Sequence, residues 1–412
     1  MGALVLVLGL LSSFLKKRTF LSEPLLALLA GFAMGRNGLD LLDPARWTDP
    51  YPFLEEAARL TIAIGVMAVA LRLPPGYISH IRRPVGMLLG LAMPLMWTAS
   101  SLIAMAILDL PLWPALLIGA IVTPTDPIVA ASIISGEVAE RNIPERVRHT
   151  LAAESGANDG LAYPFVLLPI LVLTLPAGGA VEQWFRSAVL RQAAGGLLWG
   201  AALGYAAGWL LESAEWRGTI ENTSFLSFTL ALSLLVLASA HAIGANDILA
   251  VFASGITFGR TVTGWERAEE GSIQEAVSQF FTLPGFALIG LVAPWAEWLE
   301  MGWRAPALAV AILMLRRLPA LLLIRRLLGP LGSWPDTLFV GWFGPLGMAA
   351  VYYSLVALRS TGLREAWVAG SLLVCASLLV HGVTASPLTK LYGRSARQNR
   401  RTRVPEEPGS GP

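Results

Sequence analysis

Windows of about 20 apolar residues recur along almost the whole chain, and only short polar connectors separate them. Such a window, folded as a helix, crosses the roughly 30 Å hydrocarbon core of a bilayer. Only 14% of the 412 residues are charged, about half the fraction found in soluble domains. We therefore expect an all-α polytopic membrane protein, in which residues 1–390 form one transmembrane domain.

About thirteen membrane spans are predicted from these windows. They cover approximately residues 2–14, 20–36, 54–71, 85–108, 114–135, 147–174, 187–211, 225–241, 247–260, 278–298, 304–324, 336–358 and 366–389. The first window resembles a signal peptide, but its basic cluster Lys16-Lys-Arg18 follows the apolar run instead of preceding it. We therefore expect it to be the first membrane helix.

The distribution of Lys and Arg among the predicted loops decides the orientation. Placing the loop with Lys16-Lys-Arg18 in the cytoplasm puts about two thirds of the 30 basic residues on that side. An odd number of spans then leaves the N-terminus outside and the C-terminus in the cytoplasm, with the protein in the plasma (inner) membrane. Residues 391–412 are basic and rich in Pro and Gly, so we expect a disordered cytoplasmic tail.

Two of the predicted spans are interrupted by helix-breaking residues. The fifth contains Pro124 and Pro127, and the twelfth contains Gly344-Pro-Leu-Gly347. Gly and Pro are common in membrane helices, so either break alone has little meaning. These two breaks, however, lie at matching positions in helices that run in opposite directions. This pattern predicts inverted repeats with two broken crossing helices and a substrate site between them near the bilayer midplane.

The first break reads Thr123-Pro-Thr-Asp-Pro127, and its prolines leave the carbonyls of Ala120 and Thr123 without helical partners. Free backbone groups at this depth are tolerated only against protein or a water-filled cavity. With Thr125 and Asp126 beside them, they suit a cation or a helix dipole. A simple packing kink is the alternative, but a carboxylate in the membrane costs several kcal/mol unless it has a partner or a task.

The sixth predicted span carries Glu154-Ser-Gly-Ala-Asn-Asp159. At 100° per residue Ser155 and Asp159 share one face, whereas Glu154 shares a face with Asn158 and lies about 140° from Asp159. The two acids therefore have different neighbours. An acid neutralised by a basic partner is structural, whereas Asp159, with a hydroxyl beside it, can exchange a proton for a cation.

A basic partner is available in the eleventh span, where Arg316 and Arg317 lie in apolar sequence. An unpaired guanidinium there is costly, so we expect Arg317 to pair with Glu154. Arg316 is either an alternative partner or a side chain that extends to the cytoplasmic headgroups. Asp247 lies at the outer end of the ninth span, where it either caps the helix or serves ion access.

Other residue types restrict the function further. The net charge of +2 and the scattered basic residues do not predict a nucleic-acid partner. A single Cys375 excludes an internal disulfide. No two histidines have metal-ligand spacing, and we expect His241 and His381 to lie near span ends as interfacial polar groups. No cofactor is predicted; the expected partners are monovalent cations, protons and the lipid bilayer.

Four motifs together resemble the NhaP-like sodium/proton antiporters of the cation:proton antiporter superfamily, especially the subgroup similar to fungal plasma-membrane sodium/proton antiporters. They are Thr123–Pro127, Ala153–Gly160 followed by Tyr163-Pro-Phe165, Arg316–Pro319 and Phe339–Gly347. The resemblance spans nearly all the membrane portion. Trp342 departs from the family pattern, because fungal relatives commonly carry a histidine there.

The resemblance implies a homodimer with a thirteen-helix, NhaA-like antiporter fold. A mobile core domain, from spans near residues 85–174 and 304–389, would move past a dimerisation domain formed by the remainder. Cation and proton would compete for Asp159. The site would be completed by Thr125, Asp126 and Ser155 and held together by Asn158, Glu154 and Arg317. Asn-Asp in place of Asp-Asp implies electroneutral exchange.

These observations favour a secondary active sodium (or lithium)/proton antiporter that serves pH homeostasis, and not an enzyme. Potassium/proton exchange needs the same residues and remains open. A distant alternative is an intramembrane aspartyl protease that uses Asp126 and Asp159, but its Gly-x-Gly-Asp and Tyr-Asp motifs are missing. An ion channel is a further alternative, but the sequence shows no short filter-like re-entrant segment.

Overall fold

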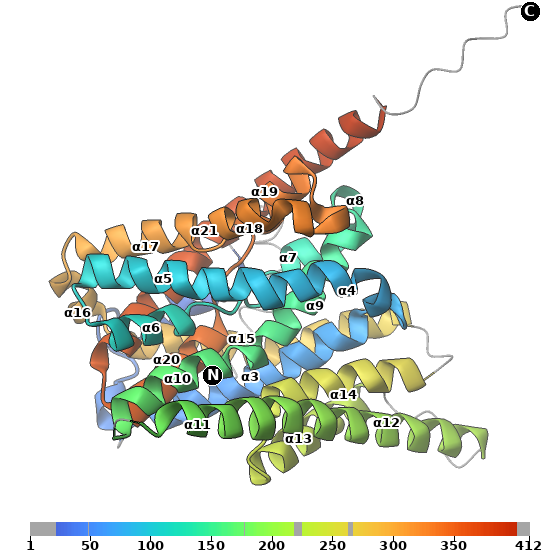
Figure 1. Ribbon diagram of the computed structural model, residues 1–412, viewed down its shortest axis with the longest axis horizontal. Helices are drawn as coiled ribbons and strands as arrows, with labels where there is room; N and C mark the ends of the chain where they lie inside the picture. The colour runs from blue at the N-terminus through green and yellow to red at the C-terminus, as the bar shows by residue number, and fades with distance from the viewer. Residues whose placement is uncertain (1–21, 48, 177, 218–224, 263–266, 402–412) are drawn as a thin grey trace, which may run out of the picture.

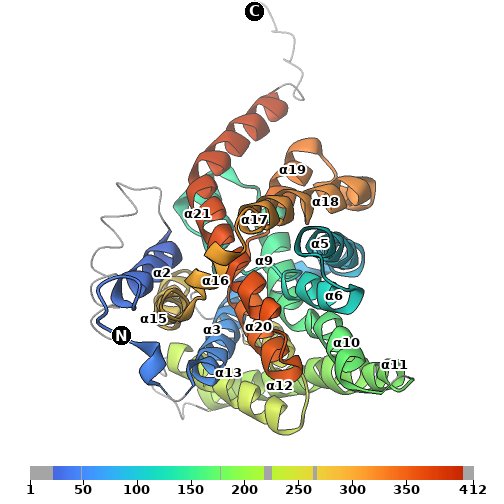
Figure 2. The ribbon, with the colours of Figure 1, turned by 90° about the vertical axis from the view of Figure 1, so that its left-hand side faces the viewer.

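The computed structural model describes residues 22–47, 49–176, 178–217, 225–262 and 267–401, and these ranges contain helices but no strand. The helices lie side by side in a bundle that is seen from the side in Figure 1 and nearly end-on in Figure 2. The predicted first span, residues 2–14, falls outside the described residues. The all-α prediction is confirmed for the described part of the chain.

Six helical stretches are long and apolar enough to cross a membrane, which agrees with a polytopic membrane protein. They are Tyr77–Leu108, Glu145–Thr174, Ala180–Ala214, Phe225–Ala242, Arg304–Leu327 and Arg364–Ser395. Glu23–Met34, Leu112–Ile121 and Phe280–Val292 are shorter apolar helices, so the number thirteen stays a prediction.

The first half of the chain contains short and long helices in turn. They are α2 (Glu23–Met34), η1 (Pro44–Arg46), α3 (Pro50–Arg72), α4 (Tyr77–Met87), the π-helical η2 (Leu88–Ala92), α5 (Met93–Leu108), α6 (Leu112–Ile121), α7 (Ala131–Ile134), α8 (Glu137–Asn142), α9 (Glu145–Leu161) and α10 (Tyr163–Thr174).

The second half begins with the continuous run of α11 (Ala180–Trp184), the π-helical η3 (Phe185–Ala194) and α12 (Gly195–Trp216). It continues with α13 (Phe225–Ala242), α14 (Asp247–Thr261), α15 (Arg267–Val292), α16 (Trp295–Glu300), α17 (Arg304–Leu315), α18 (Leu318–Ile324), η4 (Arg325–Leu327), η5 (Gly329–Leu331), α19 (Trp334–Trp342), α20 (Met348–Thr361) and α21 (Arg364–Arg401).

Both predicted helix interruptions are present. The α6 helix ends at Ile121 and regular helix resumes only at Ala131, while α19 ends at Trp342 and α20 begins at Met348. The backbone N–H of Asp126 donates to the carbonyl of Pro345 at 2.8 Å, so the two interruptions touch. We call residues 122–130 the first break and residues 343–347 the second break.

The α9 helix lies near the centre of the bundle, as Figure 2 shows. Gly156 and Gly160 face α14, and a side chain at either position would overlap Phe252 or Leu249. This close approach fixes the rotation of α9, because only glycine lets the two helices meet there.

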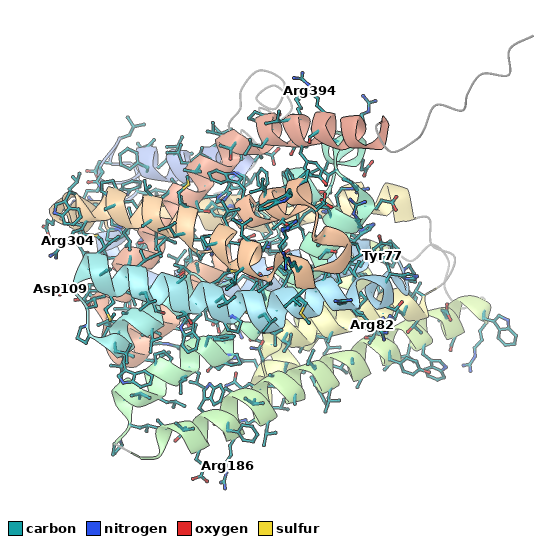
Figure 3. The ribbon with its side chains drawn as sticks, turned by 45° about the horizontal axis from the view of Figure 1, so that its top comes forward. Tyr77, Arg82, Asp109, Arg186, Arg304 and Arg394 are labelled. Carbon is teal, nitrogen blue, oxygen red and sulfur yellow. The ribbon has the colours of Figure 1, made fainter. Side chains whose placement is uncertain are left out.

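The bundle has two ends, and the labelled residues of Figure 3 identify them. Asp109 and Arg304 lie at one end, and Tyr77 and Arg82 lie at the opposite end. We call the end with Asp109 and Arg304 the outer end, because the Lys/Arg distribution predicts that it faces outward. The last helix, α21, continues to Arg401 and so extends into the segment for which the sequence predicts disorder.

Candidate functional site

The polar residues of α9 between Glu154 and Asp159 are all inside the protein. Glu154, Ser155, Asn158 and Asp159 are each at most 3% exposed. The hydroxyl of Ser155 donates to the carbonyl of Leu151 at 2.7 Å, a local bond that leaves its oxygen able to accept. Four buried polar side chains on one helix turn and a half require partners from neighbouring elements.

Glu154 and Arg317 form a buried ion pair. Nη1 and Nη2 of Arg317 each lie 2.8 Å from a different oxygen of the Glu154 carboxylate, the bidentate arrangement that is strongest for this pair. Nε of Arg317 also donates to the carbonyl of Val340 at 2.9 Å. The pair therefore joins α9 to the start of α18 and to the end of α19, and its charges neutralise each other.

Asn158 joins α9 to the first break. Its Nδ2 donates to Thr125 Oγ1 at 2.7 Å and to Glu154 Oε1 at 3.0 Å, and its Oδ1 accepts from the backbone N–H of Thr125 at 3.2 Å. The helical phase that places Asn158 beside Glu154 is thus present in the structure. Thr123, in contrast, donates its hydroxyl to the carbonyl of Gly119 in the preceding helix, α6.

Asp126 accepts hydrogen bonds from the first break and from the start of α20. Its Oδ2 accepts from the backbone N–H of Met348 at 2.6 Å, and its Oδ1 accepts from Ile128 and Val129 at 2.7 and 3.2 Å. Met348 is the first residue of α20, so the carboxylate sits at a helix N-terminus, where negative charge is favourable. Each oxygen of Asp126 therefore has at least one partner.

Arg316 lies at helix C-termini, whereas Asp126 lies at a helix N-terminus. Its guanidinium donates to the carbonyls of Val122 and Gly344, and more weakly to that of Pro124 at 3.4 Å. These carbonyls follow the C-termini of α6 and α19, where positive charge is favourable. Arg316 is only 2% exposed, so it neither pairs with Glu154 nor reaches the headgroups, and the headgroup alternative is wrong. Carbonyls freed by the breaks provide its buried partners instead.

Asp159 differs from the other buried acids. It is 1% exposed, and its Oδ1 has no hydrogen-bond partner among the residues that the structure describes. Its backbone carbonyl accepts from the hydroxyl of Tyr353, which fixes the backbone rather than the carboxyl group. An ionised carboxylate in such a place requires a cation or a proton to balance its charge.

Two residues of this region were not identified from the sequence. Tyr353 lies in the apolar stretch of α20. The only signal in the sequence is that a buried tyrosine hydroxyl needs a hydrogen-bond partner. His381 was expected near a span end, and that expectation is wrong. Because α21 continues to Arg401, His381 lies inside it, 5% exposed, with its Nε2 3.1 Å from the carbonyl of Trp342.

Asp247 is the first residue of α14, and its neighbour Asn246 donates from Nδ2 to the carbonyl of Gly160 at 2.9 Å. Oδ2 of Asp247 is 2.8 Å from Nη1 of Arg59, and His241 lies 3.5 Å away. The capping role considered for Asp247 belongs to Asn246, whose Oδ1 accepts from the N–H of Leu249.

Two touching breaks, with an arginine at two helix C-termini and the carboxylate of Asp126 at the N-terminus of α20, form the arrangement that membrane transporters with broken helices have. The family model described as "Sodium/hydrogen exchanger, transmembrane" matches residues 2–391. The chain belongs to this family, and the resemblance found in its motifs is confirmed.

Relatives agree with this assignment, and a solved structure shares the fold. A Na(+)/H(+) antiporter of Schizosaccharomyces pombe is 30% identical over 409 residues, which cover 93% of this chain and 87% of the relative. The Na(+)/H(+) antiporter of Saccharomyces cerevisiae is 30% identical over 86% of this chain, which spans only 37% of that relative's length. The sodium proton antiporter MjNhaP1 of Methanocaldococcus jannaschii at pH 8 shares the fold, with a TM-score of 0.69, 19% identity, and 95% and 97% of the two chains covered.

Proposed function

We propose that the protein is a secondary active sodium (or lithium)/proton antiporter in which the cation and the proton compete for Asp159. The observation that carries this proposal is the buried Oδ1 of Asp159, which lacks a partner among the described residues. The relatives named sodium/proton antiporters support the choice of sodium. Membership in a transporter family indicates no enzymatic reaction.

We propose that the cation is held by oxygen atoms of Asp159, Ser155, Thr125 and Asp126. The hydroxyl of Ser155 has a free lone pair, and Thr125 and Asp126 present oxygens from the first break. Glu154, Arg317 and Asn158 hold α9 against that break. When the cation leaves, a proton on Asp159 replaces its charge. Because Glu154 is neutralised by Arg317, one charge is exchanged for one charge, and we propose electroneutral exchange.

The remaining parts of the proposal concern architecture and location. We propose a homodimer of thirteen-helix protomers in the plasma (inner) membrane, with the N-terminus outside and the C-terminus in the cytoplasm. Residues 85–174 and 304–389 would form the moving core, and the remainder would form the dimerisation domain. The touching breaks support this division, because both lie within the core and share Asp126 and Arg316.

Potassium/proton exchange is the second candidate. A relative named K(+)/H(+) antiporter NhaP2, from Shewanella oneidensis, is 26% identical over 69% of this chain. Its similarity is weaker than that of the fungal sodium/proton antiporters, which favours sodium. An aspartyl protease is disfavoured, because all three oxygen contacts of Asp126 hold backbone N–H groups in place.

Exchange in liposomes tests the function. The purified protein is reconstituted with an imposed pH gradient, and chloride salts of sodium, lithium and potassium are added in turn. We expect sodium or lithium to dissipate the gradient in the wild type, and Asp159→Asn to abolish the response. Asp109→Asn is the matched control, because Asp109 lies in an exposed turn at φ 56°, a conformation that asparagine also tolerates.

Each outcome has a definite meaning. Equal dissipation by wild type and Asp159→Asn would contradict the role of Asp159. A response to potassium alone would replace sodium with potassium as the substrate. Cleavage of a model transmembrane peptide that depends on both Asp126 and Asp159 would favour the protease instead.

A further inference from the structure

Two arginines at the outer end connect the proposed core to the proposed dimerisation domain. Arg359, in the last turn of α20, places its Nη2 2.8 Å from Oε1 of Glu55 in α3. Arg364, the first residue of α21, donates from Nη1 to the hydroxyl of Tyr51 in α3 at 2.6 Å. The first residue of each pair belongs to the core and the second to the dimerisation domain.

Arg364 makes two further contacts at the same end. Its guanidinium carbon lies 5.4 Å from the centre of the Tyr51 ring, a cation–π distance. Its Nη2 and Nε lie 2.5 and 3.1 Å from the two carboxylate oxygens of Glu297 in α16. The short loop between α20 and α21 is thus attached to α3 on one side and to α16 on the other.

These contacts can be broken at moderate cost. The side chains of Arg359 and Arg364 are 68% and 41% exposed, whereas that of Arg317 is 2% exposed. Arg364 also lines a cavity of about 660 Å³ together with Glu297, Arg304 and Glu365. Water and ions can therefore replace the partners of both arginines, whereas the side chain of Glu55 is only 9% exposed and must gain water of its own when the pair opens.

The same helix carries these contacts and the site. At its first residue, Met348, α20 binds Asp126; one turn and a half later the hydroxyl of Tyr353 binds the carbonyl of Asp159; and near its end Arg359 binds Glu55. A helix is rigid along its length, so a displacement of its outer end is transmitted to the groups that surround Asp159.

We propose that the pairs Arg359–Glu55 and Arg364–Tyr51 form a latch that closes the outer side of the site and opens in every transport cycle. This inference rests on the proposed function. With the latch closed, α20 and α3 are held together at the outer end and Asp159 is buried. With the latch open, the core can slide along α3 and expose Asp159 to the outside. Alternating access requires such a contact to be present in one state and absent in the other.

Reversible cross-linking tests the latch. Glu55→Cys and Arg359→Cys are introduced together after the single cysteine is removed by Cys375→Ala, and a short bifunctional thiol reagent with a reducible bond joins them. We expect cross-linking to abolish cation/proton exchange in liposomes and reduction to restore it.

The matched control joins two helices within the dimerisation domain. Arg59→Cys with Asp247→Cys replaces a pair of the same 2.8 Å length between α3 and α14. Each variant is compared with its own reduced state, so that effects of the substitutions cancel. We expect the control to keep its exchange rate after cross-linking. Undiminished exchange in cross-linked Glu55→Cys/Arg359→Cys would overturn the latch but leave the proposed function intact.

Charge reversal supplies a second test without cross-linking. We expect Arg359→Glu to change the exchange rate by about fivefold or more, because the buried Glu55 loses its partner, with unchanged cation affinity. Adding Glu55→Arg should bring the rate back towards wild type, because the pair is re-formed with opposite polarity. If the double variant exchanges at a rate no closer to that of the wild type than Arg359→Glu does, this pair does not form the latch. Absence of exchange in Cys375→Ala with every cation would contradict the proposed function, and the latch with it.

Discussion

Asp126 and Asp159 are buried to the same degree and lie at the same site, yet they have opposite surroundings. Asp126 is 3% exposed and accepts three backbone N–H bonds, whereas Asp159 is 1% exposed and its Oδ1 lacks a partner among the described residues. The difference teaches that burial of an acid does not by itself identify the ion-binding group. We base the proposal that Asp159 binds the cation on the hydrogen-bonding capacity that its carboxyl group keeps after folding.

The largest expected effect is the loss of cation binding on Asp159→Asn. A cation that binds only the folded protein raises its stability by about 2.7 kcal/mol when present at 100 times its Kd. We expect saturating sodium to raise the Tm of the wild type and to leave the Tm of Asp159→Asn unchanged. An equal sodium-induced rise in both proteins would place the cation elsewhere.

Breaking the pair Glu154–Arg317 should be the most destabilising change. Removing one partner leaves the other charge buried and alone, which typically costs about 3–5 kcal/mol. We expect Glu154→Gln to lower the Tm strongly in detergent solution without sodium. Replacing both residues, with Glu154→Leu and Arg317→Met, should cost less than the single change, because no unpaired charge is left. A Glu154→Gln protein as stable as the wild type would contradict a structural role for the pair.

Asp126→Asn should have a smaller and different effect. The amide of asparagine keeps one acceptor but directs N–H groups towards the N–H of Met348, so a buried donor loses its partner at a cost of about 1–3 kcal/mol. We expect a lower Tm and reduced exchange, with the sodium-induced rise in Tm partly retained. Complete loss of that rise would show that Asp126 is as essential to the cation as Asp159.

The competition between cation and proton predicts a definite pH dependence. If both bind the carboxylate of Asp159, protonation removes the cation's ligand, so the apparent sodium affinity falls as the pH falls. We expect about a tenfold loss per pH unit below the pKa of the site and no dependence well above that pKa. Apparent Kd values for sodium, measured at several pH values, check this. A Kd that is constant over the whole range would exclude a shared carboxylate.

The smallest effect is expected for Tyr353→Phe. The hydroxyl of Tyr353 fixes the backbone carbonyl of Asp159, and losing one such hydrogen bond costs about 0.5–1.5 kcal/mol. We expect a two- to about tenfold weaker sodium affinity with a nearly unchanged maximal exchange rate. A lower maximal rate with unchanged affinity would indicate that Tyr353 acts in the movement of the core instead.

The positions of the breaks and the helical phase of α9 could be predicted from the sequence, because both follow from local rules. Pro124 and Pro127 cannot continue a helix, and a spacing of four residues puts Glu154 and Asn158 on one face. The ion pair Glu154–Arg317 was predicted from the free-energy cost of leaving either charge unpaired in an apolar span. Structure and prediction agree at these residues.

Partners that come from irregular backbone could not be predicted. Arg316 was expected to need a carboxylate or the headgroups, but the breaks expose carbonyls of Val122 and Gly344 that bind it in the interior. The position of His381 depended on the length of α21, and helix ends are poorly determined by composition. The first case depends on which backbone carbonyls lack helical partners, and the second depends on where a helix ends. Neither follows from local composition.

By itself, the sequence determined that the chain is an all-helical membrane protein, where its helices break, and which polar side chains enter the apolar interior. Hydropathy and helical periodicity are local properties, so they can be read without knowing the neighbours. Only the tertiary structure decided which partners each acid has. Asp126 is bound because the N-terminus of α20 meets it, Glu154 because Arg317 does, and Asp159 keeps its free oxygen because no described residue reaches it.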